Sequence, residues 1–262
     1  MFSINPFAEL SATVPPAVMQ NFVLLMVALV VLGTLFDIIH KGSAAYFFNL
    51  WRKAQQTGKK KLGAGDMVSL TVQTAAVDVL TSAEFCNPNR RIAHLLTMYG
   101  FICYVVTTAL LVFSYPTPEA AAPAILVALW YLGALMVMVG GFWFWFFIRA
   151  DVYAEGHSPF RIVQADLFIL SLLATVTFGF IWGILQASGG GLAAYLFLGL
   201  YLLSTLVLFG SIPWSKFSHM FFKPAAALQK RVEKATGSRR NLPPPADLPE
   251  TLGNPRSHPA HY

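Results

Sequence analysis

Long uncharged stretches, separated by basic segments, constrain the fold of this chain more than any other feature. Residues 10–36, 92–118, 120–148 and 167–215 contain no Asp, Glu, Lys or Arg. A helix needs about 20 mostly apolar residues to cross a bilayer. The first three stretches hold one such helix each. The last holds two, because Ser188-Gly189-Gly190-Gly191 interrupts it. The sequence therefore predicts five spans, at residues 17–39, 92–114, 123–148, 162–186 and 191–213.

The basic residues predict the topology of these spans. All 18 Lys and Arg residues lie within residues 41–91, 149–161 and 216–256, which flank the spans at alternating ends. Because Lys and Arg concentrate in cytoplasmic loops, we expect the N-terminus outside and the C-terminus in the cytoplasm. Only 11% of the chain is charged, against about 25% in a soluble domain. The net charge of +6 is therefore interpreted as contact with anionic lipid, not with nucleic acid.

The fold class expected is an all-α integral membrane protein, a five-transmembrane-helix bundle with three regions. Residues 1–16 form an outer segment, residues 17–223 the membrane domain, and residues 224–262 a cytoplasmic tail. The tail is rich in proline and polar residues, so disorder is expected after about residue 237. Residues 41–90 form a cytoplasmic loop within the membrane domain. That loop is expected to contain an aromatic interfacial helix and a second helix, at residues 44–53 and 67–80.

Two histidines are expected at one depth in the cytoplasmic end of the bundle. His94 lies about one turn inside the second span, and His219 lies just beyond the fifth. Ionisable residues at membrane depth mark candidate functional sites. Two facing imidazoles suit the axial positions of a b-type haem, with Arg91 and Lys216 near its propionates and Gly100 leaving room for the macrocycle. The alternative is that both histidines are interfacial residues of a simple membrane anchor.

Three further residues are candidates for a quinone site or for proton transfer. Asp166 lies at the start of the fourth span, where a carboxyl group removed from water is a candidate functional group. The alternative to a role in proton transfer is that Asp166 forms an ion pair with Arg161. His157 lies in the short loop before that span and is equally explained as a plain loop residue. Asp37, at the end of the first span, could instead pair with Lys41.

The chain carries two cysteines, Cys86 and Cys103. An iron–sulfur cluster usually takes four protein ligands, so any such cluster must belong to a partner. Nothing in the sequence indicates an independent active site, since it has no nucleophile–base arrangement and no phosphate-binding loop. A transporter is disfavoured, because the spans contain few polar residues and no internal repeat.

The segments around the two histidines resemble a known family. Asp78-Val79-Leu80, residues 91–101 and residues 216–220 are similar to the nitrate reductase gamma-subunit-like membrane cytochromes. That group includes the membrane subunits of heterodisulfide reductase and of the quinone-interacting membrane-bound oxidoreductase. The resemblance covers most of residues 15–235. It implies a subunit of a respiratory or sulfur-metabolism redox complex in a bacterial or archaeal inner membrane. Such a subunit passes electrons between quinone and a cytoplasmic iron–sulfur or flavin oxidoreductase through one haem b.

The sequence departs from this family in two respects. Members with two haems carry a second histidine pair nearer the outer face, where this chain has Tyr104 and Tyr201. The expectation is therefore a single haem. In addition, no iron–sulfur domain precedes the spans, as it does in the quinone-interacting oxidoreductase. The chain thus also resembles a stand-alone membrane anchor associated with adenylylsulfate reductase. A haem-free anchor that tethers such a cytoplasmic reductase is the alternative function.

Overall fold

The computed structural model describes residues 2–83, 85, 87–148, 161–215, 217 and 219–238. Within these residues the regular structure is entirely helical. Five helices are long and apolar enough to cross a membrane: α2 (Pro16–Lys41), α5 (Pro88–Phe113), α6 (Ala124–Trp143), α8 (Leu167–Ala187) and α9 (Leu192–Gly210). A short π-helix, η2 (Phe144–Ile148), continues α6. The predicted fold class, an all-α multi-pass membrane protein, is confirmed. The side of the membrane that each terminus occupies stays a prediction.

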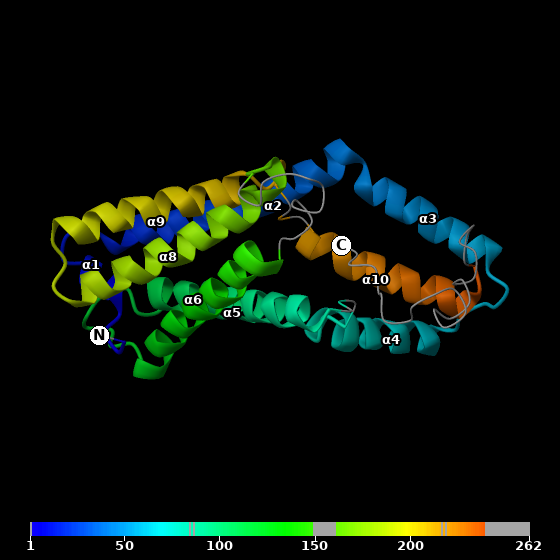
Figure 1. Cartoon of the computed structure of the whole chain (residues 1–262), viewed down its shortest axis with the longest axis horizontal. Helices are drawn as coiled ribbons and strands as arrows, with labels where there is room; N and C mark the ends of the chain where they lie inside the picture. Colours follow the sequence, from blue (N-terminus) through cyan, green and yellow to red (C-terminus); the bar gives the residue numbers. More distant parts are fainter. Residues whose placement is uncertain are drawn as a thin grey trace.

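The remaining helices lie at the two ends of the bundle (Figure 1). At one end, α1 (Pro6–Leu10) lies beside the N-terminus. From the other end extend α3 (Ser43–Thr57), α4 (Ala64–Gln73), the π-helix η1 (Thr74–Leu80) and α10 (His219–Thr236). We call this end the basic end, because every described Lys and Arg residue lies there. The two helices expected at residues 44–53 and 67–80 are present as α3 and as α4 with η1.

The spans form two closely packed antiparallel pairs, α5 with α6 and α8 with α9, and α6 packs against α8. In the α5–α6 contact, the backbones of the two helices approach each other closely. A Cβ atom on Gly133 of α6 would lie 2.9 Å from the carbonyl oxygen of Gly100 on α5. The expectation that Gly100 leaves room for a macrocycle is therefore wrong, because α6 fills that space. Outside these pairs, α2 packs chiefly against α9.

An aromatic cluster fills the half of the bundle that lies away from the basic end. Trp130 of α6 and Trp182 of α8 are completely buried. Tyr104 of α5 stacks on Trp130 at 5.2 Å between ring centroids, and Tyr201 of α9 stacks on Trp182 at 5.7 Å. Phe7 of α1 contacts both tryptophans, at 5.6 and 5.0 Å. The N-terminal segment therefore packs into the core of the bundle.

Helix α10 was not predicted. It spans residues 219–236, so the expected boundary at residue 223 falls inside it, next to Pro224. Two backbone N–H groups just after α3, those of Lys59 and Lys60, donate to the carbonyl oxygen of Thr236, at 2.9 and 3.2 Å. The end of α10 is thus attached to the α3–α4 connection. The tail for which disorder was expected lies almost entirely outside the described residues.

Candidate functional site

His94 lies in the second turn of α5, and the segment that precedes this helix folds back onto it. The side chain of Asn87 caps α5 by accepting hydrogen bonds from the N–H groups of Asn89 and Arg90. Before this cap, Ser82 adopts a left-handed conformation with φ 49° and is almost completely buried. Its Oγ lies 3.1 Å from Nδ1 of His94. The connection between η1 and α5 therefore supplies a hydrogen-bond partner to the histidine ring.

Further contacts fix this connection in place. Arg91 Nε donates to the carbonyl oxygen of Thr81 at 2.7 Å, and the Tyr99 hydroxyl donates to that of Leu80 at 2.6 Å. The Phe85 ring lies 4.9 Å from the His94 ring, between centroids. Arg91, expected near a haem propionate, thus also holds the segment that contacts His94.

The contact with Ser82 bears on what His94 can bind. A neutral imidazole that donates its Nδ1–H to a hydroxyl oxygen keeps the lone pair of Nε2 available, and that lone pair is what binds a metal ion. Metal-bound histidines commonly have such an outer hydrogen-bond partner, which fixes the ring orientation. The surroundings of His94 therefore suit a metal ligand.

His219 is the first residue of α10, at the same basic end. His219 and Lys223, one turn further along α10, are close enough to His94 to interact with it electrostatically. The His219 ring makes an edge contact with Phe168 of α8, at 5.7 Å between centroids. Phe217, which precedes it by two residues, is buried 5.7 Å from Phe168. The structure thus brings the two predicted histidines to one site, with Phe217 anchoring the start of α10.

The two candidate carboxylates also lie at the basic end. Asp166 is buried, and its carboxylate accepts a hydrogen bond from the backbone N–H of Val163 at 2.8 Å. This contact begins the short 3-10 helix η3 (Gln164–Asp166) that leads into α8, so Asp166 has a structural role in helix entry. Asp37 is buried in α2, one turn after Gly33, which packs against Ile212. Because residues four apart share a helix face, Asp37 lies on the face of α2 that packs against the α9–α10 connection. Roles for either carboxylate in proton transfer stay predictions.

Two of the predicted site residues, Lys216 and His157, lie outside the described residues.

The positions where a second histidine pair would lie in a two-haem member are packed with aromatic side chains. Tyr104 and Tyr201 are both 4% exposed. A Cβ atom on Gly179 of α8 would come within 2.5 Å of the Tyr104 hydroxyl and 3.1 Å of the Tyr201 ring. Both tyrosines thus contribute to the packing of the aromatic cluster.

The fold and these contacts define a multi-pass helical membrane protein with a histidine site at its basic end. The family model of citrate utilization protein B, CitB, matches residues 7–240, and the chain belongs to this family. No curated protein and no solved structure matches the chain. The resemblance to the nitrate reductase gamma-subunit-like cytochromes stays a prediction.

Four residues of the site were not predicted from the sequence: Ser82, Phe85, Phe168 and Phe217. The only local signal for the first two is the Asn87-Pro88 helix start, which indicates a turn just before α5. That signal places residues 81–86 near the first turns of α5 without specifying which side chain meets His94. The contacts of Phe168 and Phe217 depend on the packing of α8 against the start of α10.

Proposed function

We propose that this protein is the electron-transfer subunit of a membrane redox complex. It would pass electrons between membrane quinone and a cytoplasmic iron–sulfur or flavin oxidoreductase through one b-type haem at the basic end. The observation that carries this proposal is the pairing of His94 with Ser82, with His219 within electrostatic range. When bound, the haem would supply one-electron chemistry that no side chain of this chain provides.

The residues at the basic end suit such a group in three ways. His94 and His219 are the residues that would hold the haem iron, and they come from two helices, α5 and α10, that are far apart in the sequence. Arg91 and Lys223 place positive charge beside them, which suits the propionates of a haem. Aromatic rings lie against both histidines, and they would limit the access of water.

The packing of the spans supports a cofactor between α5 and the α9–α10 connection. Helix α5 makes its close backbone contact with α6, and α9 packs chiefly against α8. Across the bundle, α5 approaches the start of α10 through the rings of Phe101 and Phe217, at 6.5 Å between centroids. Side chains can move aside for a planar group, whereas interlocked backbones cannot.

Quinone and proton chemistry would take place at the same end. Asp37 and Asp166 are buried carboxylates there, and they are the candidate groups for proton exchange with quinone. The elements that extend from the basic end offer a surface for the soluble partner. Because the family's description refers to citrate utilization, an oxidoreductase that acts on a carboxylate is the first partner class to test. Adenylylsulfate reductase, suggested by the resemblance, is the second.

The test is the dithionite-reduced minus oxidised visible spectrum of the purified protein. We expect a b-type α band that is lost in His94→Ala and in His219→Ala. His40→Ala is the matched control, because His40 lies in the last turn of α2 at the same end of the bundle and stacks on Phe36 instead. The α band of the His40→Ala variant should be unchanged.

The absence of a band in folded wild-type protein, expressed with sufficient haem, would contradict the proposal. That result would favour the alternative function, a haem-free anchor that tethers a cytoplasmic reductase through the elements of the basic end.

A further inference from the structure

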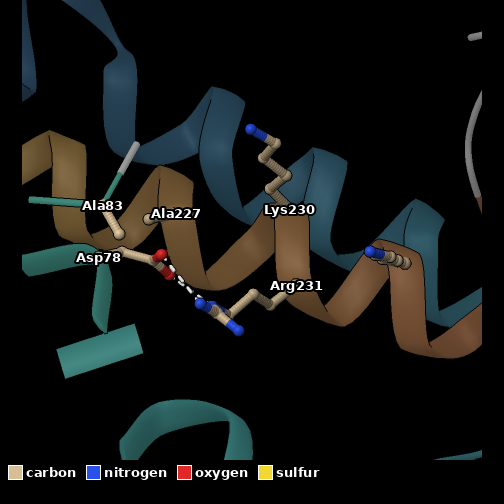
Figure 2. Close-up of a pocket in the computed structure, with 6 residues that line it drawn as sticks. Asp78, Ala83, Ala227, Lys230 and Arg231 are labelled. Atoms are coloured by element: carbon tan, nitrogen blue, oxygen red, sulfur yellow. Dashed lines mark hydrogen bonds and ion pairs between the residues drawn. The ribbon is translucent and has the colours of Figure 1, made fainter. Parts of the chain in front are cut away.

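An ion pair joins α10 to η1 outside the bundle (Figure 2). Arg231 donates through Nε to Asp78 Oδ2 and through Nη2 to Oδ1, the latter at 2.9 Å. Its Nη1 reaches Gln73 Oε1 at 3.4 Å. The side chains of Arg231 and Asp78 are only 27% and 12% exposed. A two-pronged, partly shielded pair of this kind is among the stronger ionic contacts, and its geometry is specific.

The position of the ion pair connects it to both histidines. Asp78 lies in η1, four residues before Ser82, which contacts His94. Arg231 lies in α10, the helix that begins at His219. The two elements that carry the contacts of the histidine site are therefore held to each other at this point.

The surface beside the ion pair consists mostly of charged side chains. Next to the ion pair lies a cavity of about 370 Å³. Its lining is formed by two alanines and four charged residues: Asp78, Ala83, Ala227, Lys230, Arg231 and Lys234. Figure 2 shows that Lys230 points away from Asp78. Small side chains beside a cavity do not interlock, so they cannot fix how far one helix slides along another. Arg231, in contrast, makes directional contacts across the junction, to Asp78 and Gln73.

We propose that Asp78 and Arg231 are positioning residues that set the register of α10 against η1. They thereby place His219 opposite His94. The expected effect on haem rests on the proposed function, whereas the expected effect on α10 does not. Neither residue touches the cofactor, and both act through the helices that carry its ligands.

The test exchanges the two charges in the full-length protein in detergent micelles. The variants are Asp78→Arg, Arg231→Asp and the double variant with both changes. Two quantities are measured: hydrogen exchange of the amides of residues 219–236, and the haem spectrum with its midpoint potential. We expect exchange about tenfold faster in each single variant. We also expect part of the haem to change from low-spin to high-spin if His219 no longer holds it. The double variant should restore both quantities.

Lys234→Asp is the matched control, because it changes the charge of the same helix by the same amount and lines the same cavity. It should leave both quantities near those of the wild type. Asp78→Asn replaces Asp78→Arg if the latter does not fold, since it removes the charge while keeping the size of the side chain. Its haem spectrum should then change in the same direction.

The outcomes separate this proposal from the proposed function. Unchanged exchange in the single variants, or a double variant no better than either single one, would overturn the positioning role with or without haem. Faster exchange with an unchanged haem spectrum would overturn the placement of His219. A wild-type protein without haem would contradict the proposed function, and the exchange data would still decide the register of α10.

Discussion

The close contact of α5 with α6 makes Gly133 a sensitive position, and Gly133→Ala measures how close that contact is. A Cβ atom there would lie 2.8 Å from the backbone nitrogen of Tyr104 and 2.9 Å from the carbonyl oxygen of Gly100. Both are backbone atoms, which cannot rotate away. Ordinary contacts begin at 3.4 Å, so the helices would have to separate by about 0.6 Å, the difference between 3.4 and 2.8 Å.

Forcing extra volume into a packed core costs about 1–3 kcal/mol. Replacing glycine by alanine inside a helix returns up to about 1 kcal/mol through helix propensity. With the full propensity gain, the net expectation for Gly133→Ala is a loss of about 0–2 kcal/mol in the free energy of unfolding, and of about 1–3 kcal/mol relative to a helical Gly→Ala change without a close contact.

A thiol-reactivity assay suits this measurement. Cys103 lies in α5, and its Sγ donates to the carbonyl oxygen of Leu129 in α6 at 3.3 Å. Its reaction with a maleimide therefore reports separation of the two helices. A Cys86→Ser background leaves Cys103 as the sole thiol, because the sequence contains 2 cysteines. On heating in detergent micelles, Gly133→Ala should become reactive at a lower temperature than its parent.

The control is Gly199→Ala in α9, where nothing lies within 4 Å of an added Cβ atom. This variant should be as stable as its parent, or slightly more so because of helix propensity. If Gly133→Ala were as stable as Gly199→Ala, the reasoning would be refuted, since α5 and α6 could not then be in backbone contact at Gly133.

Two further substitutions test contacts in the half of the bundle away from the basic end. Thr108→Val leaves the buried indole N–H of Trp130, now 2.9 Å from the Thr108 hydroxyl, without an acceptor. We expect a loss of about 1–3 kcal/mol in thermal or denaturant unfolding followed by tryptophan fluorescence, and an unchanged midpoint would count against this hydrogen bond. Asn5→Ala removes the cap of α1 and the 2.8 Å bond from Asn5 Nδ2 to the carbonyl oxygen of Tyr115. The amides of residues 2–14 should then exchange hydrogen faster, while those of α5 and α6 keep their rates. If residues 2–14 were as well protected as in the wild type, Asn5 would not be what holds this segment.

The spans could be predicted from the sequence because their signal is local. The Ser188–Gly191 interruption separates α8 from α9 as expected, and Gly189, Gly190 and Gly191 all have positive φ. The largest difference is at α8, predicted from residue 162 and observed from Leu167. Hydropathy alone does not show that Asp166 binds the N–H of Val163 and holds the preceding residues in a different turn.

Helix α10 could not be predicted in this way, because distant residues stabilise it. Its sequence contains a proline and several charges, which are typical of a tail. Its contacts include those to Asp78, 153 residues away, and to the backbone of Lys59 and Lys60. These pairings exist only once the chain has folded.

The candidate site was predictable only in outline. The topology of the spans brings His94 and His219 to one end of the bundle. The partner of His94, Ser82, depends on a left-handed turn that no common motif indicates. Gly100 was misassigned because the space beside a glycine is defined by its neighbour, and here that neighbour is Gly133.

The packing of α2 against α9 has a consequence for the order in which the helices assemble during translation. Among the five spans, α2 leaves the ribosome first, and its chief contact is with α9, which leaves last. The pairs α5–α6 and α8–α9 consist of neighbours in the sequence, so each can assemble as soon as its second helix is synthesised. During most of translation, α2 therefore lies in the bilayer without its main protein contact. Truncation before residue 192 should leave it exposed to lipid and to membrane quality-control proteases.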